Sequence, residues 1–164
     1  MIELIVLDVD GCMTDGKIVY SASGDELKAF NVKDGFAIVN WIRLGRQVAI
    51  ITGRESAIVA RRAEELGIKH LYQGVKNKME RLEKLCAQLG IAMRNVAMIG
   101  DDLNDYRALR ACGLSFVPAD AHHRVIEIAD VVLSRKGGDG AVREMIELLI
   151  HREGLEEEYL ASWT

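Results

Sequence analysis

The chain of 164 residues has little proline, little cysteine and no long apolar run. Pro118 is its one proline and no Gly/Ser-rich linker interrupts the sequence, so we expect a single domain over residues 1–164. The three cysteines form no CxxC motif and cannot all pair with one another. This argues against a disulfide framework and favours a reducing compartment.

Charge and hydropathy exclude further classes of partner. The formal net charge is -4, whereas a protein that binds nucleic acid needs a basic face. No apolar run reaches the length of a membrane span, and the first residues lack the basic stretch that opens a signal peptide. We therefore expect a cytoplasmic protein with neither a nucleic acid nor a membrane as partner.

Strand-like and helix-like segments alternate along the chain. Several of the strand-like segments are apolar on both faces, which is typical of buried parallel strands. The alternation predicts an α/β fold with a doubly wound parallel sheet, covered by helices on both faces. The predicted strands are 3–9, 46–52, 69–74, 95–100, 113–118 and 129–134. The predicted helices begin near Phe36 and cover 56–66, 78–89, 103–111, 122–129 and 141–150, and the aromatic and sulfur side chains expected in the core are Phe36, Trp41 and Met98.

Two segments depart from this alternation. The stretch KIVYSASGDELKAFN has the pattern of strand, turn and strand, and predicts a hairpin flap over about residues 16–31. The last residues, about 152–164, have the pattern of a tail. Tyr159, Leu160 and Trp163 are unusual in a solvated tail, so we expect this segment to dock on another surface.

Acidic residues gather where two of the predicted strands end. LDVDGCMTDG places Asp8 and Asp10 after the first strand, and MIGDDLND places Asp101, Asp102 and Asp105 after the fourth. Each motif alone is typical of a strand exit or a helix cap. In open parallel sheets, however, ligands bind outside the carboxyl ends of the strands. Carboxylates that meet there repel one another, so the arrangement needs a cation or a shared proton.

Two other strand ends carry groups that can bind phosphate. IITGR places Thr52 beside Gly53, and Lys78 opens the helix after the third strand. Taken singly, a TGR is typical of a helix cap and a lysine is typical of a surface. Gathered in one crevice with the acids, they predict phosphoryl transfer: one carboxylate is the nucleophile, a second is the acid and base, and the hydroxyl and lysine bind the phosphoryl oxygens.

These segments resemble the haloacid dehalogenase superfamily, whose motifs appear in order as DVDGCMTDG, ITGR, Lys78 and GDDLND. The resemblance implies that Asp8 is the catalytic nucleophile and that Asp10 is the general acid and base. It also implies a phosphate site formed by Thr52, Gly53 and Lys78.

The same resemblance implies a magnesium site. Its Mg²⁺ ligands would be the side chains of Asp8 and Asp101 and the backbone carbonyl of Asp10. Asp102 and Asp105 are candidates for a further metal ligand or for support of the site.

From about residue 3 to residue 150 the chain is similar to the 3-deoxy-D-manno-octulosonate (KDO) 8-phosphate phosphatases. The stretches FNVKDG, HLYQGVKNK, ADAH and GGDGAVRE carry this closer match. It implies a haloacid-dehalogenase-type fold without a cap domain and a role in lipopolysaccharide precursor synthesis. It also implies a homotetramer in which a neighbouring subunit helps to close the site.

Alternatives remain at this point. A sister group of phosphatases acts on nine-carbon keto-deoxy sugar acid 9-phosphates and has an acidic residue where this chain has Arg54. Arg54 suits a sugar carboxylate, or else forms a salt bridge with a nearby acid. A receiver-type phosphoacceptor module would carry its acceptor Asp after the third strand, where LYQG stands. A non-catalytic oligomerisation domain would not need the complete motifs.

Two further features have plain structural interpretations. Cys12 is expected to be a small buried hydrophobic residue. The glycine-rich loop 137–140 is either a simple turn or a backbone that approaches the substrate of a neighbouring subunit.

Overall fold

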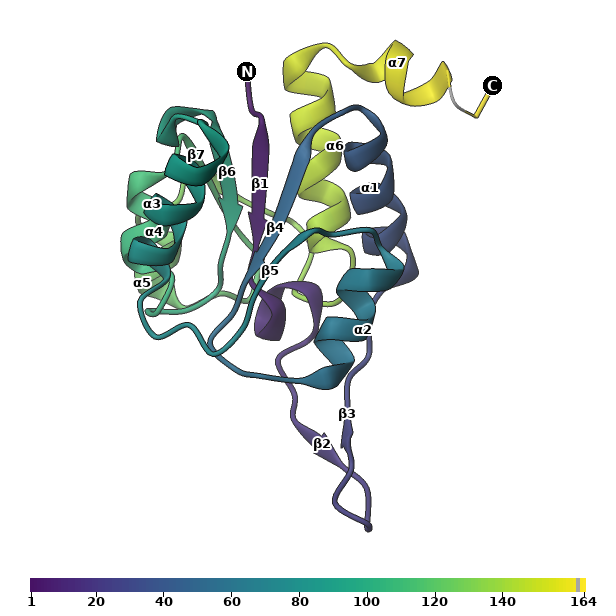
Figure 1. Ribbon diagram of the computed structural model, residues 1–164, viewed down its shortest axis with the longest axis vertical. Helices are drawn as coiled ribbons and strands as arrows, with labels where there is room; N and C mark the ends of the chain where they lie inside the picture. Colours follow the sequence, from purple (N-terminus) through teal and green to yellow (C-terminus); the bar gives the residue numbers. More distant parts are fainter. Residues whose placement is uncertain (162) are drawn as a thin grey trace.

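A parallel sheet forms the centre of the computed structural model, which describes residues 1–161 and 163–164 (Figure 1). The sheet has six strands in the order β5-β4-β1-β6-β7-β8, and all neighbours are parallel. The strands are β1 (Leu4–Leu7), β4 (Gln47–Ile51), β5 (His70–Tyr72), β6 (Val96–Ile99), β7 (Leu114–Val117) and β8 (Val131–Val132). The six predicted strands are confirmed, each shorter than the apolar run that indicated it.

The direction of winding reverses beside β1. The chain runs from β1 outward through β4 to β5, and then returns to the other side of β1 with β6. Leu7, the last residue of β1, pairs with Ile50 of β4 and with Ile99 of β6. The residues that follow β1 and β6 therefore leave the sheet at the same level, at the position where open α/β sheets bind ligands.

Helices cover both faces of the sheet, as predicted. Ile5 and Leu7 of β1 point into a core with α1, α2 and α6, and Leu4 and Val6 point into a second core with α3, α4 and α5. Alternate strand residues face opposite sides, so β1 is apolar throughout. The helices are α1 (Val32–Arg43), α2 (Ala57–Glu65), α3 (Lys78–Leu89), α4 (Tyr106–Ala111), α5 (His123–Ile126), α6 (Ala141–Glu153) and α7 (Glu156–Ala161), with a short 3₁₀ turn at Met93–Asn95. None of the helices described is long and apolar enough to cross a membrane.

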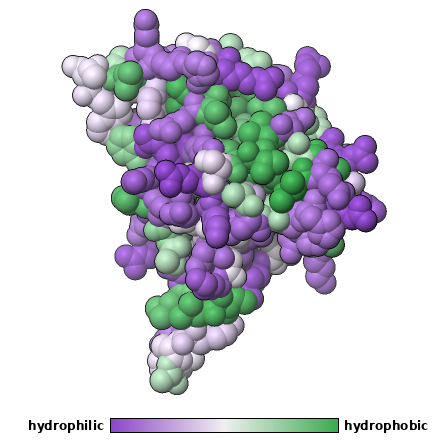
Figure 2. Space-filling view, turned by 180° about the vertical axis from the view of Figure 1, so that it is seen from behind, coloured by the Kyte–Doolittle hydropathy of each residue, from purple (hydrophilic) through white to green (hydrophobic). Residues whose placement is uncertain are grey.

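The predicted hairpin is present. β2 (Val19–Tyr20) and β3 (Glu26–Leu27) pair in antiparallel fashion and project from the end of the sheet where β1 ends (Figure 1). Figure 2 shows a hydrophobic band across this projection. Its exposed apolar residues are Ile18, Val19, Tyr20 and Leu27.

The C-terminal segment packs on the chain itself. Trp163 lies against Phe36 of α1 with 4.9 Å between the ring centroids, and its Nε1–H donates a hydrogen bond to Oδ1 of Asn40 (3.1 Å). The placement of Phe36 in the core was wrong: its side chain is 40% exposed, because it lies on the outer side of α1 where Trp163 covers it in part. Trp41 and Met98 are buried as expected.

Candidate active site

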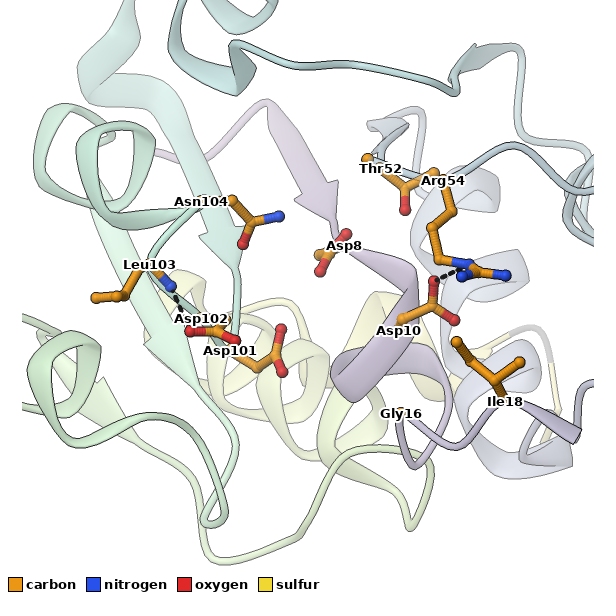
Figure 3. Close-up of a pocket in the computed structure, with 11 residues that line it drawn as sticks. Asp8, Asp10, Gly16, Ile18, Thr52, Arg54, Asp101, Asp102, Leu103 and Asn104 are labelled. Atoms are coloured by element: carbon orange, nitrogen blue, oxygen red, sulfur yellow. Dashed lines mark hydrogen bonds and ion pairs between the residues drawn. The ribbon is translucent and has the colours of Figure 1, made fainter.

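A cavity of about 460 Å³ opens at the carboxyl ends of the strands, beside the reversal between β1 and β6. In Figure 3, Asp8 and Asp101 face the same space from these two strands, and Asp10 is turned toward Arg54. The lining residues are Asp8, Asp10, Gly16, Ile18, Thr52, Gly53, Arg54, Asp101, Asp102, Leu103 and Asn104. The structure therefore brings seven of the residues predicted from sequence onto one cavity.

The loop after β1 carries the first two carboxylates. Asp8 is almost fully buried, and its backbone N–H donates a hydrogen bond to the carbonyl of Ile99 (3.2 Å). A helical turn, Val9–Met13, follows and contains Gly11 with φ of 90°. A Cβ atom on Gly11 would lie 2.0 Å from Oδ2 of Asp101. Glycine is therefore required here for its backbone angle and because Asp101 approaches so closely.

Lys78 and Asp105 are buried outside the lining of the cavity. The Nζ atom of Lys78 lies 2.8 Å from Oδ1 of Asp8 and 2.6 Å from Oδ1 of Asp105. Burial alone would lower the pKa of Lys78, but the two carboxylates hold that pKa above its ordinary value. Oδ2 of Asp105 accepts hydrogen bonds from the backbone N–H groups of Asp101 (3.2 Å) and Asp102 (3.4 Å). Asp105 thus supports both the lysine and the loop that presents Asp101.

The donor atoms of Asp8, Asp101 and Cys12 lie within 4.8 Å of one another. Burial, followed by the negative charges of Asp8 and Asp105, raises the pKa of Asp101 to about 8. Two carboxylates at this separation, with Asp8 buried and Asp101 partly buried, are stabilised by a proton or by a cation. Burial and the charge of Asp8 also raise the pKa of the Cys12 thiol well above its ordinary value, so this thiol stays protonated. The oxygen donors of Asp8 and Asp101 fit Mg²⁺, which prefers oxygen ligands.

The other predicted residues at the strand ends lie beside this pair. Thr52 is buried directly after β4, where its backbone N–H donates to the carbonyl of Tyr72 (3.0 Å). Gly53 continues the same turn along the lining of the cavity. Oδ1 of Asp102 accepts a hydrogen bond from the backbone N–H of Leu103 (2.7 Å), as Figure 3 shows. This hydrogen bond between neighbouring residues stabilises the loop that contains Asp102.

A charge network from the hairpin surrounds Asp10. The Nζ atom of Lys28 lies 2.5 Å from Oδ1 of Asp10, and the Nε atom of Arg54 lies 3.8 Å from Oδ2. Arg54 also pairs with Glu26 at 3.0 Å. The salt bridge considered for Arg54 is thus formed, and it involves two acids. Sequence reasoning missed Lys28 and Glu26, although a spacing of two residues in an extended segment places two side chains on the same side.

Comparison of the sequence with known proteins agrees with the geometry of this site. Residues 70–146 match the sequence model of the haloacid dehalogenase-like hydrolases. The 3-deoxy-D-manno-octulosonate 8-phosphate phosphatase KdsC of Escherichia coli strain K12 is 47% identical over 157 residues, which cover 96% of this chain and 84% of the relative. The chain belongs to the KDO 8-phosphate phosphatase family. The predicted resemblance is confirmed.

Solved structures of the KDO 8-phosphate phosphatase family have the same fold. The Moraxella catarrhalis protein, in complex with a magnesium ion, a phosphate ion and KDO, has a TM-score of 0.96 and 40% identity, covering 99% of this chain and 94% of that one. The cobalt-bound Haemophilus influenzae protein has a TM-score of 0.89 and 41% identity, covering 93% and 90%. Each of the two structures therefore covers more than nine-tenths of this family member.

In this member of the family, the glycine-rich loop 137–140 packs against the loop after β1. The backbone N–H of Gly138 donates to the carbonyl of Cys12 (3.0 Å), and a Cβ atom on Gly137 would lie 1.8 Å from the carbonyl oxygen of Gly11. The loop is therefore more than a simple turn: it supports the Asp8 loop of its own chain. Its approach to a neighbouring subunit stays a prediction.

Proposed function

We propose that this chain is a magnesium-dependent phosphatase that hydrolyses KDO 8-phosphate to KDO and phosphate for lipopolysaccharide precursor synthesis. The observation that carries this proposal is the convergence of Asp8, Asp10, Asp101 and Thr52 on one cavity at the reversal of the sheet. The 47% identity to an enzyme of that name supports the substrate. The magnesium, phosphate and KDO bound by the Moraxella catarrhalis relative support the cofactor and the product.

The first half of the reaction forms a covalent intermediate. A carboxylate oxygen of Asp8 attacks the phosphorus atom, and the bond between phosphorus and the sugar oxygen breaks. Asp10, turned into the same cavity, donates its proton to the departing sugar oxygen, so that KDO leaves as a neutral alcohol at this position. The hydroxyl of Thr52 and the backbone of Gly53 lie at the lining, where they can donate to the phosphoryl oxygens.

The second half releases phosphate. Asp10, now ionised, takes a proton from a water molecule that attacks the phosphorus of the aspartyl-phosphate, and the Asp8 carboxylate is restored. Asp8 and Asp101, with the Asp10 carbonyl, would hold Mg²⁺, which supplies positive charge against the phosphoryl oxygens when bound. Lys78 acts from behind the lining: its ammonium holds the Asp8 carboxylate at 2.8 Å and offsets its charge.

Arg54 is the proposed determinant of the sugar acid. Its guanidinium lies at the cavity and is 43% exposed, within reach of a carboxylate on a bound sugar. In the free protein Asp10 and Glu26 are its partners. A substrate carboxylate would compete with these acids for the guanidinium.

The exposed hairpin supports a homo-oligomer. Ile18, Val19, Tyr20 and Leu27 are 46–62% exposed on one projecting segment, next to the cavity that Ile18 lines. We propose that these residues are covered in a homotetramer, which light scattering after size exclusion tests directly. A monomer at micromolar concentration would contradict this. The free thiols of the three cysteines agree with the proposed cytoplasmic location.

A phosphate-release panel tests the function. Purified protein, with and without Mg²⁺, is given KDO 8-phosphate and a nine-carbon keto-deoxy sugar acid 9-phosphate. Faster Mg²⁺-dependent release from KDO 8-phosphate supports the proposal, and faster release from the nine-carbon ester supports the alternative substrate. No release from any sugar phosphate would indicate a non-catalytic domain. A phosphoenzyme that persists without releasing phosphate would indicate a receiver-type module.

Two variants test the role of Arg54 in the same panel. Arg54→Glu should lower kcat/KM for the sugar acid phosphate, because it replaces the cation that faces the substrate carboxylate. Arg61→Glu makes the same change of charge on the exposed side of α2, where Arg61 pairs with Glu65 at 3.0 Å. It should leave kcat/KM unchanged.

A further inference from the structure

The hairpin places a buried cation against the general acid of the proposed reaction. Lys28 directly follows β3, and its side chain is only 1% exposed although the hairpin projects into solvent. Lys17, at the other end of the hairpin, is 77% exposed and pairs with Asp15 at the surface (3.0 Å). A lysine is buried in this way only when a partner compensates its charge. For Lys28 that partner is Oδ1 of Asp10 at 2.5 Å, with Glu26 farther away at 3.7 Å.

The same network connects both sides of the cavity. Glu26 of β3 binds the guanidinium of Arg54 (3.0 Å), which belongs to the turn after β4. Arg54 in turn lies 3.8 Å from the second oxygen of Asp10. The Asp10 carboxyl is therefore held from two directions, and the shorter contact comes from the hairpin.

We propose that Lys28 is a positioning residue for Asp10: its ammonium fixes the carboxyl at the cavity, so that the hairpin controls the protonation of the leaving group. This rests on the proposed phosphatase function. Neither the sequence motifs nor the lining of the cavity includes Lys28, because it acts through Asp10 and does not touch the substrate. Its loss should affect the step in which Asp10 donates a proton.

The leaving group distinguishes this role from a general effect on folding. A sugar alkoxide is a poor leaving group and needs a proton from an acid, whereas nitrophenolate leaves without one. A misplaced Asp10 should therefore slow the hydrolysis of KDO 8-phosphate but not the attack of Asp8 on 4-nitrophenyl phosphate. A damaged fold would slow both.

The experiment compares Lys28→Met, Lys28→Arg and the matched control Lys17→Met on these two esters and on glycerol 3-phosphate. Lys28→Met should lower kcat on the alkyl esters about tenfold or more, within the range of general acid effects, with little change in KM. The pre-steady-state release of nitrophenolate from 4-nitrophenyl phosphate reports the attack of Asp8 alone, and its rate should stay within about twofold of wild type. Lys28→Arg should restore most of the loss, and Lys17→Met should match wild type.

Three results would overturn the positioning role. They are a release of nitrophenolate that slows as much as the turnover of the alkyl esters, no loss on either kind of ester, and a crystal structure of Lys28→Met in which Asp10 keeps its orientation. Wild-type protein that hydrolyses glycerol 3-phosphate but not KDO 8-phosphate refutes the substrate alone, and the role of Lys28 is then measured on the glycerol ester. Wild-type protein that is inactive on every ester refutes the phosphatase and the role of Lys28 with it.

Discussion

The Nζ atom of Lys78 lies 2.6 Å from Oδ1 of Asp105, in the interior behind the cavity. The same ammonium lies 2.8 Å from Asp8, so one cation compensates two buried carboxylates. Lys78 is 2% exposed and Asp105 is fully buried, so solvent does not screen this pairing. This ion pair joins Lys78, the first residue of α3, to Asp105, the residue that precedes α4, and it lies next to the nucleophile Asp8.

Removal of this cation should destabilise the fold. Lys78→Met leaves Asp8 and Asp105 buried without their partner, and breaking a buried pair in this way costs about 3–5 kcal/mol. Urea unfolding followed by circular dichroism measures the loss. Lys76→Met, two residues earlier and exposed, is the control and should change the unfolding free energy by less than about 0.5 kcal/mol. Equal stability of Lys78→Met and wild type would show that the pair contributes nothing.

The two carboxylates of the loop after β1 should be essential for turnover. Asp8→Asn removes the nucleophile and Asp10→Asn removes the acid, so each should lower kcat by at least about 100-fold. Phosphate release measures kcat, and thermal unfolding checks that the variants fold. Asp15→Asn changes an exposed acid of the same segment and should keep its activity. A rapid Asp8→Asn or Asp10→Asn enzyme would contradict the mechanism.

The effect of Mg²⁺ on stability should depend on pH through Asp101. Burial and the charge of Asp8 raise the pKa of Asp101 to about 8 in the folded protein, whereas an Asp in the unfolded chain ionises near about 3.9. The proton that Asp101 retains contributes stability at low pH, and this contribution is lost as the pH rises through the folded pKa. Mg²⁺ should therefore raise Tm more at pH 8.5 than at pH 6, where protons compete with it.

Differential scanning fluorimetry with Mg²⁺ or a chelator measures this difference. Asp101→Asn should abolish most of the stabilisation by Mg²⁺ at both pH values, because one of the two carboxylate donors loses its charge. Stabilisation that is equal at pH 6 and pH 8.5, or that persists in Asp101→Asn, would place the cation elsewhere.

A second pH dependence should arise from Asp34, at the start of α1. Burial raises the pKa of Asp34 to about 6, although the backbone N–H of Arg143 donates to its Oδ1 (2.8 Å). Since the folded pKa is raised, the contribution of this group is full at acid pH and is lost as the pH rises toward 7. Asp34→Asn should flatten the fall in unfolding free energy between about pH 4 and pH 7. Asp25→Asn, on the exposed turn of the hairpin, should leave that fall intact.

The sequence alone was sufficient for the architecture and for seven of the eleven residues that line the cavity. Apolar runs and helical spacing are local patterns, and they indicated every strand of the sheet. Strand ends are equally local features of the sequence, so the motifs were enough to place Asp8, Asp10, Thr52 and Asp101 at one edge of the sheet. The close approach of these strand ends follows from parallel pairing with β1 in the middle.

The tertiary structure decided which groups those residues meet. Lys28 and Asp10 are 18 residues apart and Lys78 and Asp105 are 27 apart, and no periodicity relates them. Phe36 has helical spacing suited to a core, but its position at the edge of α1 places it against Trp163 at the surface. Local patterns record which face of a segment avoids water; the partner of a buried charge depends on how distant segments fold together.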